Sequence, residues 1–225
     1  MRRMSLIKAV AIPAAAIAAA AIGTPAAFAA TTYTVTAGSA TTADNPINWH
    51  ASTTGDSPQV TFNDVDAGVT MTCDSATAAG QIDVGGGQSG SGVATINDPD
   101  PTNHKTEWFG CQGLGLTLHV AATLPWNIDA TGPTSGGVTP VEISGIVAHV
   151  NDDNGLCSFD VTGSVPGSYD NATQDLAVNG GGLTIGNVGG SLCPVLLGND
   201  EATYQATYHV DADNASFDPI QVTSE

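Results

Sequence analysis

The sequence contains very few positive charges. Only 4 of its 225 residues are Lys or Arg, against 22 Asp and Glu, so the formal net charge is −18. Three of the four, Arg2, Arg3 and Lys8, lie within the first eight residues, and Lys105 is the single Lys or Arg in the rest of the sequence. A strongly negative chain is repelled by the phosphates of nucleic acids and by anionic membrane surfaces. We therefore expect neither nucleic acid nor an anionic membrane to be a partner.

Long apolar runs are also scarce. The longest, residues 9–22, follows the N-terminal cations and leads to the small-residue site Ala27-Phe28-Ala29. A run of about 14 residues is too short to span a membrane, which takes about 20. Positive residues, a short apolar run and an A-x-A site predict a signal peptide over residues 1–29 that is cleaved on export. The expected location is extracellular, with no membrane contact after cleavage.

The cysteine spacing excludes a common type of metal site. The four cysteines are Cys73, Cys111, Cys157 and Cys193, and no two of them form a C-x-C or C-x-x-C pair of adjacent ligands. An even number of cysteines in an exported chain predicts two disulfides. Four cysteines allow three pairings. The similar separations of 38 and 36 residues favour Cys73–Cys111 and Cys157–Cys193.

Helical periodicity is absent after residue 29, whereas glycine is abundant, with 27 residues in the chain. Apolar residues instead alternate with polar ones in short segments bounded by Gly, Asn and Asp, which is typical of strands and turns. Turns are predicted over 85–92, 151–155 and 180–182, and a surface loop over 97–107. Strands are predicted near residues 32–37, 59–62, 69–73, 81–84, 93–97, 114–120, 138–150, 156–162, 174–178, 182–187, 204–210 and 217–222.

This pattern predicts an all-β fold, an antiparallel Greek-key-like sandwich or barrel with two disulfides. The mature chain, 30–225, has the length of one all-β domain and contains no Pro- or Ser-rich linker. One domain is therefore expected, although the two cysteine loops suggest pseudo-halves over 30–123 and 124–225.

No catalytic residue can be assigned from the sequence. The segment Gly87-Gln-Ser-Gly-Ser-Gly92 resembles a nucleophile elbow, but Ser91 occupies the place of the second glycine and no helix follows. Among the carboxylates Glu142 is the least turn-like, and alternation predicts that it faces outward from its strand. A secreted hydrolase with Glu142 and an Asp is the third functional hypothesis.

The sequence also contains only incomplete sets of metal ligands. The segments 151–155 and 211–214 resemble fragments of calcium loops without the full ligand spacing. A zinc site would require three histidines such as His119, His149 and His209 to converge, and separate surface positions are the favoured interpretation. We assign no cofactor and no metal residue. Divalent cations remain possible partners, because they would screen the repulsion between the carboxylates.

Aromatic residues are few, at 5% of the chain, and three of them are candidates for ligand binding. Trp108 and Phe109 precede Cys111 and follow the long predicted loop, where they could pack against a disulfide or stack on a sugar or an apolar ligand. The segment Pro125-Trp126-Asn127-Ile128 resembles the start of a further strand, in which Trp126 is expected to be buried on the side of Ile128. Core packing is the alternative for all three.

Several segments carry a resemblance that covers most of the mature chain. The segments are Val69-Thr-Met-Thr-Cys73, Trp108-Phe-Gly-Cys111, Leu124-Pro-Trp126, residues 143–150, Cys157-Ser-Phe-Asp-Val-Thr-Gly163, Tyr169-Asp-Asn-Ala-Thr173, Leu192-Cys193 and Ala202-Thr-Tyr-Gln-Ala-Thr-Tyr208. In these segments the sequence resembles uncharacterised small secreted β-rich proteins of actinobacteria, chiefly streptomycetes. The resemblance implies an actinobacterial origin and a disulfide-bonded β fold, but no activity or functional residue.

The leading hypothesis is a non-catalytic extracellular protein that acts as a binding or structural module at or near the cell wall, with a wall glycan as a possible partner. The alternative is a carrier of a small apolar ligand, with Trp108, Phe109 and Trp126 as candidate walls. A looser likeness to the neocarzinostatin family, also acidic, secreted and two-disulfide, is an analogy at the level of fold.

Overall fold

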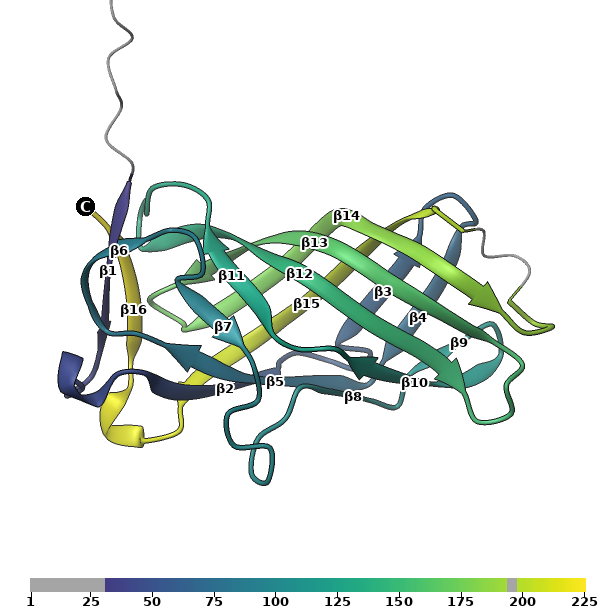
Figure 1. Cartoon of the computed structure of the whole chain (residues 1–225), viewed down its shortest axis with the longest axis horizontal. Helices are drawn as coiled ribbons and strands as arrows, with labels where there is room; N and C mark the ends of the chain where they lie inside the picture. The colour runs from purple at the N-terminus through teal and green to yellow at the C-terminus, as the bar shows by residue number, and fades with distance from the viewer. Residues whose placement is uncertain (1–30, 194–197) are drawn as a thin grey trace, which may run out of the picture. The chain divides into compact units, whose positions relative to one another are not determined.

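The computed structural model describes residues 31–193 and 198–225 (Figure 1). The predicted signal peptide lies outside the described residues. Residues 31–225 form one compact unit of antiparallel strands with two short 3-10 helices, η1 (Thr42–Asp44) and η2 (Ala215–Phe217). The all-β prediction is therefore confirmed.

Four long strands form one continuous wall of the fold. They are β12 (Val138–Asp152), β13 (Ser158–Asp170), β14 (Asp175–Gly189) and β15 (Glu201–Ala212), each paired antiparallel with the next. Figure 1 shows them crossing the molecule side by side, from teal-green to yellow. Because β12 and β15, at 15 and 12 residues, are longer than usual, each can pair along its free edge with two shorter strands in succession.

The opposite wall consists of two four-stranded panels. The first has the order β11-β7-β5-β2 and the second β10-β9-β4-β3. At one edge β12 pairs with β11 and then β10, and at the other β15 pairs with β3 and then β2. These pairings close the sheet on itself, so the fold is a barrel. The first-panel strands are β2 (Ile47–Thr53), β5 (Ser75–Ile82), β7 (Ala94–Ile96) and β11 (Trp126–Ala130); those of the second are β3 (Val60–Asp64), β4 (Val69–Cys73), β9 (Gln112–Gly113) and β10 (Leu116–Ala122).

The line where the two panels meet, here called the seam, contains the short strand β8 (Glu107–Phe109). This strand pairs with β5 through Ser75↔Phe109, Ala76↔Trp108 and Thr77↔Glu107. The Cys73–Cys111 disulfide joins the end of β4 to the connection between β8 and β9. The seam is thus fixed by one short ladder and one covalent bond.

A separate three-stranded sheet covers one end of the barrel, beyond the first panel (Figure 1). Its order is β16-β1-β6, with β1 (Thr32–Ala37), β6 (Gly85–Ser89) and β16 (Ile220–Ser224). Side-chain hydrogen bonds attach it to the long wall: the Tyr169 hydroxyl donates to the carbonyl oxygen of Ile220 at 2.8 Å, and the Thr139 hydroxyl to that of Val222 at 3.1 Å.

A bulge explains a segment that periodicity alone leaves ambiguous. Residues 146–150 are apolar at nearly every position, but the pairing of β12 with β13 shifts between Ile143 and Ile146, where Gly145 has a positive φ of 71°. The inserted residue reverses the alternation. Ile146 and Ala148 therefore point into the barrel, while His149 lies on the outer face.

The turn predicted over 180–182 is wrong, because these glycines lie inside β14. Its two halves, predicted as separate strands, form one strand of 15 residues. A Cβ at Gly180 would lie 2.5 Å from Cγ of Pro166, and one at Gly182 would lie 2.6 Å from the carbonyl oxygen of Ser164. The glycines thus allow β13 and β14 to approach closely where both strands bend.

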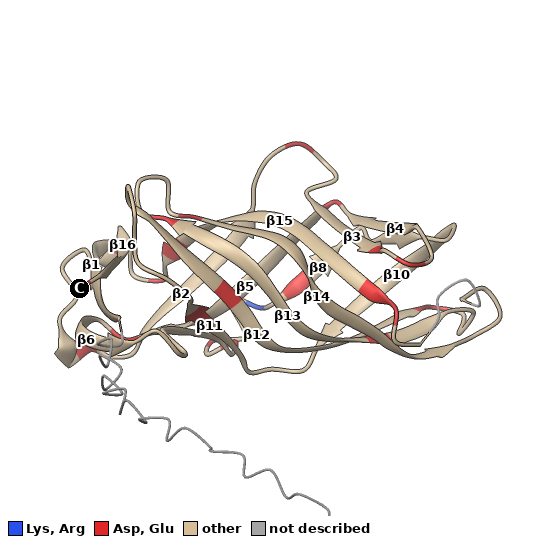
Figure 2. Ribbon diagram, turned by 90° about the horizontal axis from the view of Figure 1, so that it is seen from above, with Lys and Arg blue, Asp and Glu red and all other residues tan. Residues whose placement is uncertain are grey.

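Both disulfides have the pairing that the sequence favours, Cys73–Cys111 and Cys157–Cys193. The second joins the turn between β12 and β13 to the segment that follows β14. Figure 2 shows the acidic residues spread over the strands and loops rather than gathered in one patch. No helix in the described part of the chain is long and apolar enough to cross a membrane.

Candidate functional site

The barrel interior contains an apolar cavity of about 110 Å³ beneath the seam. Both panels and all four long strands contribute to its lining, which includes Met71, Leu118, Ala148 and Phe159 together with both cysteines of the Cys73–Cys111 disulfide. Inward-facing positions of the strands supply almost all of these side chains, because alternation places every second residue inside. The cavity is therefore a product of the closed sheet.

Two of the three predicted ligand-binding residues meet at this cavity. The rings of Trp108, from β8, and Trp126, from β11, have centroids 6.2 Å apart and an interplanar angle of 46°, and both line it. Trp126 is buried beside Ile128, as predicted, and its indole N–H donates to the carbonyl oxygen of Thr123 at 2.9 Å. Residues separated by 18 positions in sequence thus form one aromatic wall.

The third predicted residue, Phe109, is not part of this wall. Its side chain points away from the barrel interior, is 44% exposed and lines a different, polar hollow of about 340 Å³ on the outer surface. The cause is strand alternation in β8, which places Trp108 inside and its neighbour outside. Ala51, Thr77 and Ala78 line both the cavity and the hollow, so only these side chains and their strands separate the two.

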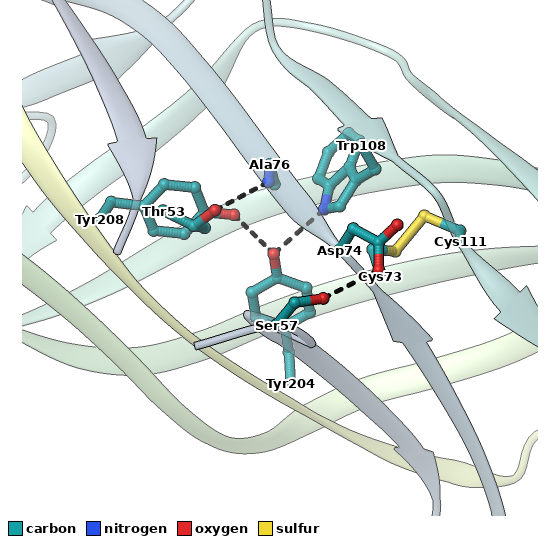
Figure 3. Close-up of a disulfide and its surroundings, with 9 residues drawn as sticks. All are labelled: Thr53, Ser57, Cys73, Asp74, Ala76, Trp108, Cys111, Tyr204 and Tyr208. Carbon is teal, nitrogen blue, oxygen red and sulfur yellow. Dashed lines mark hydrogen bonds between the residues drawn. A yellow bond between two sulfur atoms is a disulfide. The ribbon is translucent and has the colours of Figure 1, made fainter. Parts of the chain in front are cut away.

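Three polar groups form a hydrogen-bonded chain at the cavity (Figure 3). The indole N–H of Trp108 donates to the Tyr204 hydroxyl at 3.0 Å, and the hydroxyls of Tyr204 and Tyr208, both on β15, lie 2.5 Å apart. Burial raises the pKa of Tyr204 and that of Tyr208, and the neighbouring Tyr204 raises the latter further. Both hydroxyls therefore stay protonated at neutral pH.

Counting donors in this chain leaves one proton without an acceptor. An indole N–H can only donate, and two tyrosine hydroxyls bring two protons, of which one is used between them. Neither hydroxyl forms another hydrogen bond within residues 31–193 and 198–225. Whichever hydroxyl donates to the other, a hydroxyl proton remains available in an apolar environment, where an unmade hydrogen bond is costly.

A second unused donor lies on the same cavity. Trp49 on β2 is 3% exposed and lines it, yet its indole Nε1 has no hydrogen-bond partner among the described residues. Trp49 also lines a smaller cavity of about 50 Å³ that extends toward β16. The interior of the barrel thus holds spare hydrogen-bond donors.

The seam itself is held by hydrogen bonds around the disulfide (Figure 3). The buried hydroxyl of Thr53 accepts from the backbone N–H of Ala76 at 2.9 Å and donates to Oε1 of Gln59 at 2.6 Å. The Ser57 hydroxyl donates to Asp74 Oδ1 at 2.9 Å, next to Cys73. These bonds hold the ends of β2, β4 and β5 together beside the disulfide.

The histidines considered for zinc do not converge. His119 Nε2 lies 2.8 Å from an oxygen of Asp153, whereas Nδ1 of His149 and of His209 lies 2.6 Å and 3.1 Å from oxygens of Asp160 and Asp175. A hydrogen bond from Asn187, with a second from His149, lowers the pKa of Asp160. Each of these histidines therefore contacts its own carboxylates at the surface, with His209 also 3.5 Å from Asp211.

The predicted hydrolytic residue lies away from the cavity. Glu142 lies between the inward-facing Val141 and Ile143 on β12, on the outward-facing side, opposite Asp129 of β11. A different carboxyl is buried: Asp64, at the end of β3, is 1% exposed. Desolvation raises the pKa of Asp64 and the nearby Asp200 raises it further, although a hydrogen bond from the backbone N–H of Ala67 opposes both.

The predicted strands did not include β2, and Trp49 was therefore not among the candidate residues. The signal was present in Ile47-Asn-Trp-His-Ala-Ser-Thr53, where Ile47, Trp49 and Ala51 alternate and are all buried. Tyr204 and Tyr208 lie within the strand predicted near residues 204–210, but the hydrogen bond from Trp108 to Tyr204 joins residues 96 positions apart. Only the closed topology reveals that contact.

Comparison with known proteins gives no further guide, since no family model, curated protein or solved structure matches this chain.

Proposed function

We propose that the protein is a non-catalytic extracellular binding protein that carries a small apolar molecule, bearing a hydrogen-bond acceptor, in the cavity beneath the seam. The observation that carries the proposal is the spare hydroxyl proton of the Tyr204–Tyr208 pair on an otherwise apolar cavity. The two disulfides are compatible with an extracellular location. The predicted signal peptide supports the same location.

Cavity size limits the ligand. An engineered apolar cavity of about 150 Å³ stays dry and binds benzene, so a cavity of similar scale suits one small ring. The present cavity of about 110 Å³ has a lining of the same chemical character. A larger ligand would have to separate the panels at the seam, where β8 contributes only three residues.

Polarity selects among small rings. A carbonyl or ether oxygen would accept the spare proton of the Tyr204–Tyr208 pair or the indole N–H of Trp49. A net hydrogen bond of this kind is worth about 1 kcal/mol, which corresponds to roughly fivefold in affinity. Ligands that only donate would leave these protons unpaired and are disfavoured.

Benzaldehyde and styrene test this polarity, since they differ in shape by little more than a carbonyl oxygen against a methylene group. Titrations followed by tryptophan fluorescence should show saturable binding of both, because Trp108 and Trp126 line the cavity. Benzaldehyde should bind roughly fivefold more tightly. Tyr208→Phe alone leaves the Tyr204 proton without an acceptor and should keep that preference, whereas the double variant Tyr204→Phe with Tyr208→Phe removes both hydroxyl protons and should reduce it.

Two variants with an enlarged side chain test whether the probes bind inside the cavity. Ala148→Leu adds volume to the lining, whereas Val147→Leu adds it to the adjacent residue, which is 42% exposed on the outer face. The first should abolish binding of both probes and the second should leave it unchanged. The proposal fails if neither probe binds, or if Ala148→Leu binds them as the wild type does. If the probes bind as expected, native mass spectrometry of protein from culture medium would identify the natural ligand.

A wall glycan is the second candidate, and the polar hollow favours it. An exposed aromatic ring, Phe109, stands beside Ser52, Asn103 and Glu107, which is the combination of stacking face and polar groups that sugars use. Sedimentation with purified cell wall should decrease in Phe109→Ala if this candidate is correct. Equal sedimentation of wild type and variant would remove it.

A further inference from the structure

A cluster on the outer surface of the first panel brings together three potential metal ligands that are far apart in sequence. They are His50 on β2, His104 in the loop between β7 and β8, and Asp213 just after β15. Their ligand atoms all lie within 4.8 Å of one another. We propose that these three residues bind a divalent transition-metal ion of the zinc class.

The distances fit a small ion. His50 Nδ1 lies 2.8 Å and His104 Nε2 lies 3.7 Å from the same oxygen, Oδ1 of Asp213. Ligands about 2.0–2.1 Å from a tetrahedral zinc ion lie about 3.3 Å from one another, which is between these two values. The imidazole rings are stacked, with centroids 3.9 Å apart and planes 8° from parallel. Binding would require them to tilt until both lone pairs point at one ion.

The backbone holds each ligand in place. The N–H of Asp213 donates to the carbonyl oxygen of Asn48 at 3.0 Å, which fixes it beside His50. The N–H of His104 donates to the carbonyl oxygen of Asp100 at 2.9 Å, and further along this loop the hydroxyl of Thr106 donates to Asp98 at 2.7 Å. Little chain entropy therefore remains to be lost when an ion binds.

The donor set selects the class of metal. Two imidazole nitrogens and one carboxylate oxygen suit zinc and its neighbours, whereas calcium and magnesium prefer oxygen ligands alone. Asp211 is the register partner of His50 and adds negative charge nearby. His50 and His104 also line the polar hollow of about 340 Å³, so a fourth coordination position is open to water or to an external ligand.

Isothermal titration with zinc at pH 7.5 tests the proposal, using untagged protein freed of metal by a chelator. We expect one ion per chain, with calcium a much weaker competitor. His50→Ala, His104→Ala and Asp213→Asn should each weaken binding at least about tenfold, since loss even of a residue that supports a ligand costs about 10–100-fold. His104 lies outside every strand, so that variant should keep the fold and the wild-type circular dichroism spectrum.

The matched controls are His119→Ala and His149→Ala, which remove histidines that pair with Asp153 and Asp160. Binding that persists in the controls and is lost in His104→Ala supports the site. A visible absorption spectrum typical of tetrahedral cobalt, when cobalt replaces zinc, would support it independently of affinity. Absence of saturable binding, or equal loss in the controls, overturns the proposal. None of these outcomes bears on the apolar cavity.

Discussion

The two ends of the barrel interior differ in whether the hydroxyl protons of their side chains have hydrogen-bond acceptors. Toward the small sheet, the hydroxyls of Tyr169 and Thr139 donate to backbone carbonyls of β16, and Asn171 both donates to and accepts from the backbone of Val222. Beneath the seam, a hydroxyl proton of the Tyr204–Tyr208 pair has no acceptor in the described residues. The hydroxyl protons of Tyr169 and Thr139 thus have acceptors, whereas one hydroxyl proton of the Tyr204–Tyr208 pair has none.

Cavity volume follows the same division. The cavity toward β16 measures about 50 Å³ and that beneath the seam about 110 Å³, with Trp49 and Leu176 lining both. Natural interiors are packed as densely as organic crystals, and large voids are few. The capped end therefore encloses less empty space than the seam end. This contrast is why we assign ligand binding to the seam.

Removal of each disulfide should have the largest effect among the tests of that contrast. The two loops span 38 and 36 residues, so chain entropy predicts nearly equal stabilisation, about 4 kcal/mol each. We expect Cys73→Ala with Cys111→Ala, and Cys157→Ala with Cys193→Ala, to lower the free energy of unfolding in urea by similar amounts. Only the first pair lines the cavity, so only its loss should weaken the binding of benzaldehyde.

These double variants serve as controls for each other, since they match in loop length and in number of substitutions. Equal loss of benzaldehyde binding in both would mean that general loosening of the barrel, rather than the seam, determines affinity. A much larger loss of stability at the seam would mean that the Cys73–Cys111 bond does more than restrict the unfolded chain.

A pair of tyrosine variants gives the next largest effect. Tyr169→Phe leaves the carbonyl oxygen of Ile220 without its side-chain donor, and a buried unsatisfied group costs about 1–3 kcal/mol. Tyr208→Phe removes a hydroxyl whose network already has a spare proton, so we expect a smaller loss of stability. Urea unfolding of the two variants measures the difference. Equal losses would remove the distinction between the two ends of the interior.

Alternation in the sequence predicted the strands β1 and β15 and their inner faces, whereas the equally regular alternation of β2 was not recognised as a strand. It failed at Gly145 and at residues 180–182, because a bulge and a tight crossing of strands depend on the partner strand and leave only a glycine as a local signal. The disulfide pairing was predictable because the two loop lengths match.

The candidate sites were less predictable from the sequence than the strands were. Trp108 and Trp126 could be selected as scarce aromatic residues, but Phe109 could not be separated from them until the pairing of β8 fixed which neighbour faces inward. The cluster of His50, His104 and Asp213 joins three elements through barrel closure between β15 and β2. Contacts at separations of up to 163 residues leave no mark in a local pattern.

Two buried aspartates give the smallest predicted effect, with opposite signs. Burial raises the pKa of Asp64. Burial also acts to raise the pKa of Asp152, but backbone N–H groups that include those of Cys157 and Asn154 outweigh it and lower that pKa. A raised pKa means that stability falls as pH rises above the pKa of the unfolded chain, and a lowered pKa means that stability falls as pH drops below that pKa.

Asp64→Asn should therefore raise the melting temperature at pH 7, and Asp152→Asn should lower it. Both differences should shrink between about pH 5 and pH 2, where wild-type carboxyls become protonated in both states. A lower melting temperature for Asp64→Asn at pH 7 would show that the hydrogen bond from Ala67 outweighs burial and the charge of Asp200.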